Sequence, residues 1–197
     1  MEKPASTEHD VHDLIRRRWS PRAFSSQSVG DAELGSLLEA ARWAASCMNE
    51  QPWRFIVARR ENQVEFDRLL SCLNEGNQRW AQGAAVLILS VARQTFARNG
   101  KPNRHALHDV GLATAQLSLQ ATALGLAVHP MAGFSAAKAR DLYAIPEEFE
   151  PVAALAVGYP GLPEDLPDDL RARELAERSR HPQTEFAFAG TWGEPLA

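Results

Sequence analysis

The sequence is poor in cysteine and in long apolar runs. Its 197 residues include two cysteines, Cys47 and Cys72, which form no CxxC pair and cannot build a disulfide framework. We therefore expect a reducing compartment, the cytoplasm. The opening segment MEKPASTEHD has no apolar stretch of the signal-peptide kind. The longest weakly charged run, residues 110–137, is broken by Thr114 and other polar residues, so it predicts a buried helix and no membrane span.

Several catalytic and binding motifs are also missing. There is no GxGxxG or Walker loop for nucleotides, and no GxSxG elbow for a serine hydrolase. Histidines lie three residues apart at His9/His12 and at His105/His108, but no HExxH motif and no complete set of zinc ligands can be named. We therefore predict no metal site. The net charge of −4 gives no reason to expect nucleic acid as a partner.

The pattern of apolar residues predicts helices and strands in one domain. Apolar spacing of three and four residues predicts helices over residues 31–45 and 135–145, the second capped by Ser135. Residues 104–126 predict the longest helix, apolar nearly all the way round and hence central and buried. We expect residues 1–10 to be a flexible tail and residues 11–197 a single domain. Further helices are expected within residues 9–18 and 61–82, the latter with a break near Gly76; strands over 53–60, 84–93, 127–134 and 151–160; and a surface loop with one helical turn over 161–177.

Four arginines lie within nine residues of the segment LIRRRWSPRAF. Arg16 and Arg17 suit the negative end of a short helix, where cations are stabilised by the helix dipole. Arg18, Ser20 and Arg22 alternate beyond that helix, so their side chains can converge on one side of an extended segment. Two guanidinium groups and a hydroxyl suit a phosphate. From the residues alone, a solvated helix end and an anion site are both open interpretations.

Three other segments carry residues suited to ligands. In SCMNEQPWRF, the amides of Asn49 and Gln51 can each donate and accept, as recognition of a planar heterocycle requires, although an ordinary turn also uses them. In HPMAGF, Gly133 lets the backbone approach a ligand closely. In RSRHP, Arg178 and Arg180 form a second alternating basic pair, which by itself is as consistent with a charged surface.

Taken together, these segments resemble the nitroreductase family of FMN-dependent oxidoreductases. The resemblance runs from about residue 14 to residue 192, and its specificity lies in the order and spacing of the segments. It implies an α+β fold with a mixed, mostly antiparallel sheet wrapped by helices. It also implies an intertwined homodimer with FMN at the interface and C-terminal arms that cross to the partner subunit. The segments that carry it are RRRWSPRAF, AASCMNEQPWRFIV, NEGNQRWAQGAAVLIL, HDVGLATAQLSLQATALGLAVHPMAGF, VAALAVGYPG and RSRHP.

The resemblance also implies where FMN would bind. The residues matched to the family's phosphate and ribityl contacts are Arg18 and Ser20, with Arg178 and Arg180 as a late phosphate clamp; Arg22 matches a cation at the pyrimidine edge; Ser46, Cys47, Asn49 and Gln51 match a loop from the other subunit; Asn77 and Arg79 match polar contacts to the ring; and Met131, Ala132 and Gly133 match the backbone facing flavin N5. Departures at Ala45, Cys47 and Ala132 affect substrate preference. Residues 94–103, in a region that often shapes substrate access in the family, form a short segment here, so the pocket is expected to be open or formed largely by the partner.

The implied activity is transfer of hydride from NAD(P)H through bound FMN to a nitroaromatic, a quinone or free flavin, in ping-pong order. Arg22 would stabilise the anionic reduced flavin. No side chain is expected to act as nucleophile or general base, so no catalytic residue is assigned. The alternatives are another flavin reaction on the same fold (reductive dehalogenation, flavin cleavage or small-aldehyde reduction) and a non-catalytic FMN-binding module. No motif that would distinguish NADH from NADPH is visible.

Overall fold

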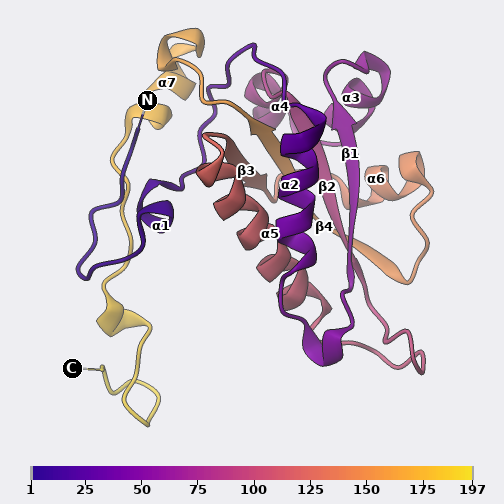
Figure 1. Cartoon of the computed structure of the whole chain (residues 1–197), viewed down its shortest axis with the longest axis vertical. Coiled ribbons are helices and arrows are strands. Elements are labelled where there is room, and N and C mark those ends of the chain that lie inside the picture. The colour runs from indigo at the N-terminus through magenta and orange to yellow at the C-terminus, as the bar shows by residue number, and fades with distance from the viewer. Residues whose placement is uncertain (1, 197) are drawn as a thin grey trace.

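A four-stranded sheet forms the centre of the fold in the computed structural model, which describes residues 2–196 (Figure 1). The strands lie in the order β1-β2-β4-β3, and each pairs with its neighbours antiparallel. The expected α+β class is confirmed. Every pairing among these four strands is antiparallel. Their bounds are β1 Trp53–Arg59, β2 Val86–Arg93, β3 Ala127–Met131 and β4 Phe149–Gly158.

The central strand β2 is buried on both faces, because its side chains alternate between two apolar cores. Leu87 and Leu89 belong to one core, whereas Val86 and Ile88 belong to the other. Full burial of such a side chain stabilises the fold by about 1.5–3 kcal/mol. A shift of one residue in register would exchange the two sets, so the pairing of β2 with its neighbours is strongly specified.

Helices cover both faces of the sheet. One face carries α2 (Asp31–Arg42) and α5 (Ala106–Ala123), and the other carries α3 (Gln63–Leu70), α4 (Glu75–Ala81) and α6 (Ala136–Tyr143). The expected cap of α6 is present, since the Ser135 hydroxyl accepts from Lys138 N at 3.2 Å. The break expected near Gly76 lies earlier, because α3 ends at Leu70 and Asn74 caps α4 by accepting from Asn77 N at 2.9 Å.

The long helix α5 is buried on one side only, which corrects the expectation of a fully buried helix. Ala113, Leu117 and Ala121 face the core. On the opposite side Leu107 is 50% exposed, and Ala115 is exposed as well. Apolar residues on both sides are typical of a helix that packs against something on each side. Among residues 2–196, nothing covers Leu107 and Ala115 on the second side of α5.

The segment after β4 contains more helix than the sequence predicted. It forms a short η2 (Pro163–Asp165) and then α7 (Asp168–Leu175), in place of a loop with one helical turn. Residues 161–177 are mostly charged, so the sequence did not indicate that α7 has a buried face. Leu170 and Glu174, four residues apart on that face, are 2% and 1% exposed.

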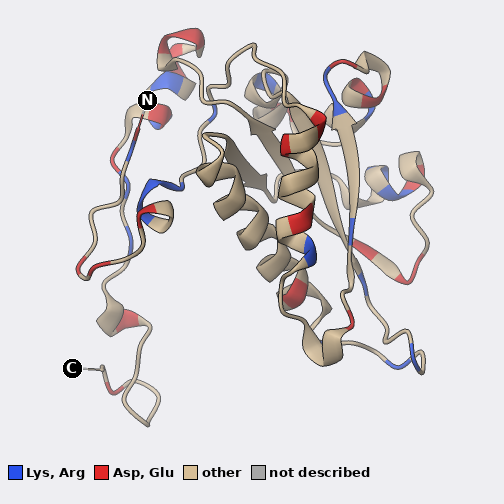
Figure 2. Ribbon diagram, in the orientation of Figure 1, with Lys and Arg blue, Asp and Glu red and all other residues tan. Residues whose placement is uncertain are grey.

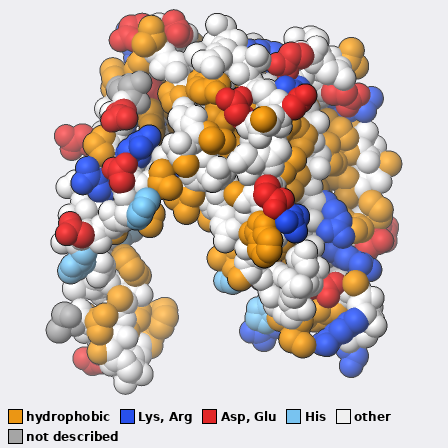
Figure 3. Space-filling model, viewed as in Figure 1, with side chains coloured by type: hydrophobic (Ala, Val, Ile, Leu, Met, Phe, Trp, Pro, Cys, Tyr) orange, Lys and Arg blue, Asp and Glu red, His pale blue; other side chains and the backbone are white. Residues whose placement is uncertain are grey.

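The N-terminal segment and the first part of the C-terminal arm run side by side, away from the sheet (Figure 1). The short helix α1 (Asp13–Arg17) and the arm of residues 176–196, with η3 (Gln183–Glu185), form this part of the molecule. From residue 183 onward the arm's backbone hydrogen bonds stay within residues 182–196, and Phe188 packs on Trp192 with ring centroids 5.0 Å apart. Figure 3 shows an open hollow between the arm and the body. The arm therefore projects from the body of the chain.

The predicted division at residue 10 remains a prediction. Met1 and Ala197, the outer ends of the two predicted ranges, lie outside the described residues. Within the expected tail, Ala5 N donates to Arg16 O at 2.9 Å and Lys3 Nζ donates to Glu174 O at 2.6 Å. Across residues 2–196, no helix is long and apolar enough to span a bilayer.

Candidate functional site

Arginines from both ends of the chain meet beside α1. Arg18, at the end of α1, donates from Nη1 to the Ser20 hydroxyl at 3.3 Å. The pKa of Arg18 is lowered, first by burial and then by the positive charges of Arg178 and Arg180 on the arm. Among residues 2–196, none of these three arginines forms an ion pair with a carboxylate. A cluster of like charges without a counter-ion is an arrangement that an anion would stabilise.

Arg178 and Arg180 differ in what their guanidinium groups already contact. Arg178 donates to the backbone oxygens of Lys3, Arg16 and Arg18, the last two at 2.9 Å. It therefore fastens the arm to the N-terminal segment, and both of its terminal nitrogens are engaged. Arg180 donates only to its neighbour's carbonyl, Ser179 O, at 2.6 Å. Arg18 and Arg180 retain more donors for an anion than Arg178 does.

The buried carboxylate of Glu174, which the sequence did not mark as a site residue, holds the backbone at Arg22 and Ala23. The Glu174 carboxylate accepts from Arg22 N at 2.9 Å and 3.0 Å and from Ala23 N at 3.1 Å. It also lies 4.0 Å from Arg22 Nη1. Backbone N–H groups pointing at one carboxylate fix the course of the chain around Arg22. The only signal in the sequence was the spacing of Leu170 and Glu174 on one face of α7.

His129 on β3 is a second residue of this region that the sequence did not mark as a site residue. Its ring packs on Trp80 with centroids 4.4 Å apart, and its Nδ1 donates to Pro21 O at 2.8 Å. Burial, and secondarily the charges of Arg22 and Arg18, lower the pKa of His129 to about 4, even though the bond to Pro21 opposes the shift. The ring is therefore neutral at pH 7, and it anchors Pro21 between Arg18 and Arg22.

Gly133 and Asn77, both matched to flavin contacts by the resemblance, meet just after β3. Asn77 Nδ2 donates to Gly133 O at 3.0 Å, and Asn74 N donates to the same oxygen at 2.9 Å. A Cβ on Gly133 would lie 2.4 Å from Asn74 Nδ2 and 2.6 Å from Asn77 Nδ2, so only glycine fits. Met131 is buried in the core, and Ala132 is exposed.

Arg79 is engaged elsewhere. Both of its terminal nitrogens donate to Asp169 on α7, at 2.9 Å and 2.8 Å. This bidentate pair raises the pKa of Arg79. The contact between Arg79 and a flavin ring stays a prediction that would require this ion pair to open.

The loop of residues 46–51 is built to hold an unusual backbone shape. It contains η1 (Cys47–Asn49), and Met48, Asn49 and Gln51 have φ of 55°, 56° and 51°. This left-handed region costs a residue other than glycine roughly 1–2 kcal/mol. Two hydrogen bonds support the loop: Cys47 N donates to Asp109 Oδ2, and Gln51 N donates to the Ser46 hydroxyl, both at 3.0 Å. Strain held in this way is typical of functional loops.

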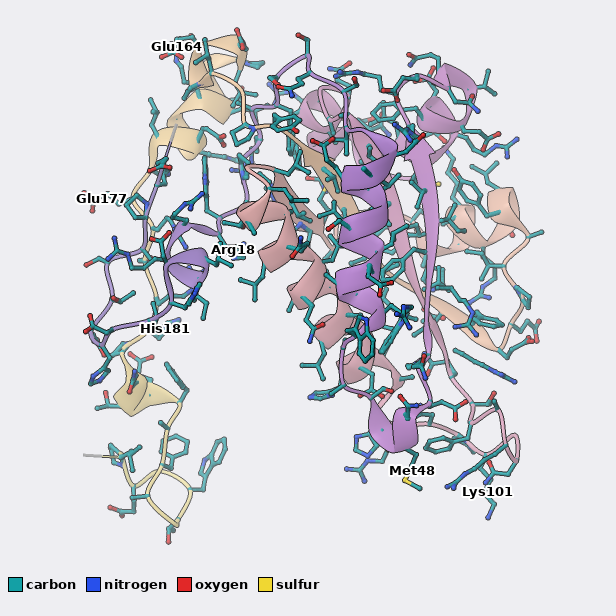
Figure 4. The ribbon with its side chains drawn as sticks, viewed as in Figure 1. Arg18, Met48, Lys101, Glu164, Glu177 and His181 are labelled. Atoms are coloured by element: carbon teal, nitrogen blue, oxygen red, sulfur yellow. The ribbon has the colours of Figure 1, made fainter. Side chains whose placement is uncertain are left out.

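Two groups of predicted site residues, the arginine cluster and the loop of residues 46–51, lie toward opposite ends of α5, as the positions of Arg18 and Met48 show (Figure 4). The contact between Asn77 and Gly133 at the end of β3 belongs to a third group. Asp109, in the first turn of α5, holds the loop of residues 46–51. The far end of α5 borders the arginine cluster, because Thr122 and Gly125 line a small hollow together with Arg17 and Trp19. An 18-residue helix is about 27 Å long. One chain therefore does not bring the two groups together.

Two of the four histidines in the spaced pairs have local partners. His12 Nδ1 accepts from Leu14 N at 3.3 Å, capping α1, and His108 Nδ1 lies 3.2 Å from the Asp109 carboxylate. In the part of the chain that the structure describes, no three His, Cys, Asp or Glu side chains gather as a metal site would require.

The sequence and the fold can now be compared with those of known proteins. The nitroreductase family matches residues 15–159 of the chain. A solved structure described as an oxidoreductase containing FMN is 34% identical, with a TM-score of 0.91 over 96% of each chain. A protein of Desulfovibrio desulfuricans solved in complex with FMN is 27% identical, with a TM-score of 0.72 over 94% of this chain and 99% of that one. The NADH dehydrogenase of Thermus thermophilus is 28% identical over 77% of this chain and 87% of its own length. The chain belongs to the nitroreductase family.

Proposed function

We propose that this protein is an FMN-dependent oxidoreductase that takes hydride from NAD(P)H. The observation that carries the proposal is the cluster of Arg18, Ser20 and Arg180, whose positive charges have no carboxylate partner among the described residues. Two relatives with similar folds are described as containing or binding FMN, and a third is named NADH dehydrogenase. When bound, FMN would supply two-electron chemistry, accepting hydride from NAD(P)H and reducing a nitroaromatic, a quinone or free flavin in ping-pong order.

The protein's own residues would bind and orient the cofactor. Arg18, Ser20 and Arg180 would hold its phosphate through charge-assisted hydrogen bonds. Arg22, kept in place by Glu174 beneath it, would stabilise negative charge that develops at the pyrimidine edge. The close packing of Gly133 against Asn74 and Asn77 would keep the backbone at the end of β3 free of any side chain toward the ring.

We further propose that the complete site needs two subunits. A twofold dimer has the same surface on both subunits, and antiparallel packing of the two α5 helices through their exposed sides would place residues 46–51 of one subunit beside Arg18 of the other. The exposed apolar side of α5 and the projecting arm supply surface for such a contact. The free thiols of Cys47 and Cys72 suit the cytoplasm.

A binding experiment tests the phosphate assignment. Arg18→Glu should weaken FMN binding by at least about 1.5–3 kcal/mol, the contribution of a charged hydrogen bond, with repulsion in addition. Riboflavin lacks the phosphate, so its weaker binding should change little. Arg16→Glu is the matched control, because this exposed arginine lies outside the cluster. Equal FMN affinity in the wild type and the Arg18 variant would refute the assignment.

Anaerobic reduction tests the activity. The purified protein with FMN should show a flavin absorption spectrum that NADH or NADPH bleaches. A panel of nitroaromatics, quinones and free flavin would then restore the spectrum at rates that rank the acceptors. Retention of FMN without bleaching by either dinucleotide would identify a non-catalytic flavin-binding module.

A further inference from the structure

An unpaired group of cations lies on the loop between β2 and α5. The basic loop, residues 94–104, carries Arg98, Lys101 and Arg104, all exposed, in a chain whose net charge is −4. Within residues 2–196 these three side chains form no ion pair. By contrast, Arg79 and Arg140 each bind a carboxylate. Figure 2 shows the basic residues gathered on this loop at one end of the sheet.

The basic loop has a defined shape. Thr95 and Pro102 form an antiparallel bridge, and Phe96 N donates to Lys101 O at 2.8 Å. Gly100, with φ of 67°, closes the turn through its own bond to Phe96 O at 2.8 Å. The Arg98 guanidinium lies 5.5 Å from the Phe96 ring centroid. These contacts hold the three cations on one short, closed loop.

The base of the loop has the same excess of donors. Asn103 N donates to Gln94 O at 2.7 Å, so these two residues face each other across the ladder and their side chains share a face. Asn103 is 2% exposed, yet neither its Nδ2 nor Gln94 Nε2 has an acceptor among the described residues. Buried donors are normally paired, so the base of this loop carries two donors that the described chain leaves without an acceptor.

The basic loop is fastened to the loop of residues 46–51. Ala97 N donates to the Glu50 carboxylate, and Arg93 N donates to Pro52 O at 2.9 Å. Figure 4 shows Lys101 and Met48 at the same end of the molecule. If residues 46–51 reach the partner's flavin, the basic loop borders the entrance to that flavin.

We propose that Arg98, Lys101 and Arg104 bind the 2′-phosphate of NADPH, so that this protein uses NADPH in preference to NADH. The inference rests on the proposed function. A phosphate monoester carries a charge of about −1.5 to −2 at pH 7, whereas each phosphate of the pyrophosphate bridge carries about one negative charge. The 2′-phosphate is the charge by which the two dinucleotides differ, so three cations that contact it would favour NADPH. NADH lacks that group and has only the pyrophosphate charge that NADPH also carries.

The kinetic test uses the dimeric FMN-loaded protein and a variant with Arg98→Gln, Lys101→Gln and Arg104→Gln combined. The rate constant for anaerobic flavin reduction divided by the dissociation constant should fall roughly 10- to 100-fold for NADPH. The value for NADH should change less than about threefold. Arg68→Gln removes an exposed cation from α3, on the other side of the sheet, and serves as the control. An unchanged ratio of NADPH to NADH, or an equal loss for both, would overturn the proposal.

A binding test does not depend on hydride transfer. Calorimetry should show that wild-type protein binds adenosine 2′,5′-bisphosphate at least tenfold more tightly than 5′-AMP, and that the triple variant loses this difference. Equal affinities in the wild type would overturn the proposal. If neither dinucleotide reduces the flavin, the proposed oxidoreductase activity is wrong, and the calorimetric difference still decides whether the basic loop binds a 2′-phosphate.

Discussion

Arg178 and Arg180 lie two residues apart but have different surroundings. Arg178 is held by the carbonyls of Lys3, Arg16 and Arg18, whereas Arg180 contacts only its neighbour's carbonyl. Although the sequence assigns the same role to both, the contacts assign Arg178 to fastening the arm and leave Arg180 available for an anion.

Replacing each arginine by alanine should separate these roles. Arg178→Ala should speed hydrogen exchange of the backbone amides in residues 3–18, because it removes three hydrogen bonds to that segment. Arg180→Ala should leave this exchange unchanged but weaken FMN binding by about 1.5–3 kcal/mol, roughly 10- to 150-fold. Mass spectrometry of exchange and fluorescence titration of FMN measure the two effects. A faster exchange in the Arg180 variant would contradict the distinction.

His129 should make stability depend on pH. Its pKa in the folded protein is lowered to about 4, against an ordinary value near 6.5. Below pH 6.5 the imidazole of His129 binds a proton in the unfolded chain, whereas the same ring in the folded protein stays neutral until the pH nears 4. The contribution of His129 is therefore complete above pH 6.5 and is lost as the pH falls toward 4.

The pH dependence should appear as a difference in the free energy of unfolding between wild type and His129→Gln. The stability advantage of wild type over His129→Gln should shrink as the pH is lowered from 7 to 4.5, by at most about 1.4 kcal/mol per pH unit. Urea unfolding at fixed protein and FMN concentrations measures it. The exposed His181, changed to glutamine, is the control. A constant advantage across this range would mean that His129 titrates normally.

Helix α5 is the element on which the proposed dimer would depend. Its inward side packs on the sheet, while Leu107, Ala115 and neighbouring residues on its outward side are exposed. An exposed apolar stripe on a helix of this length is typical of a subunit interface. The expectation of a helix surrounded by apolar contacts would therefore be met only in the dimer.

A charge on that stripe should disrupt the dimer. Ala115→Arg should lower the dimer fraction substantially, because the interface would bury an unpaired cation. Ala137→Arg, at an exposed position of α6 on the other face of the sheet, is the matched control. Light scattering after size exclusion measures both. A wild-type monomer, or a dimer unaffected by Ala115→Arg, would show that this side of α5 is not the interface.

At the scale of the whole molecule, the arm and the body are distinct parts of one chain. The tip of the arm exposes Phe186 and Trp192, at 65% and 87%, and its hydrogen bonds are local. Apolar side chains that project from their own subunit are stabilised by a partner that covers them. The arm should therefore contribute to dimer formation, and through the dimer to cofactor retention.

Truncation after Gln183 should lower the dimer fraction and the FMN occupancy together. A ligand that binds only the assembled form stabilises that form by mass action, so excess FMN should partly restore both. Size-exclusion chromatography that records protein and flavin absorbance measures both quantities in one experiment. A truncated monomer with full flavin occupancy would show that one chain is sufficient for the site.

Part of this structure followed from local patterns. The run of β-forming residues in β2 and the capping residue Ser135 predicted elements that are present, because both signals depend on neighbours along the chain. The order of the six family-like segments likewise predicted the family and the fold class. The break between α3 and α4 was misplaced, because the Asn74 cap determines where α4 begins and Gly76 is tolerated inside it.

The sequence by itself determined most of the helices and strands, the family, and which arginines and amides are available for a ligand. Only the tertiary structure decided how they are used. It brought Arg18 beside Arg178 and Arg180, assigned buried Glu174 to the backbone of Arg22, and packed His129 on Trp80. Local periodicity contains no information about contacts between residues far apart in the chain, because the packing of the whole chain determines them. The separation of two groups of site residues by the length of α5 has the same origin, and it is the reason that we propose a site shared by two subunits.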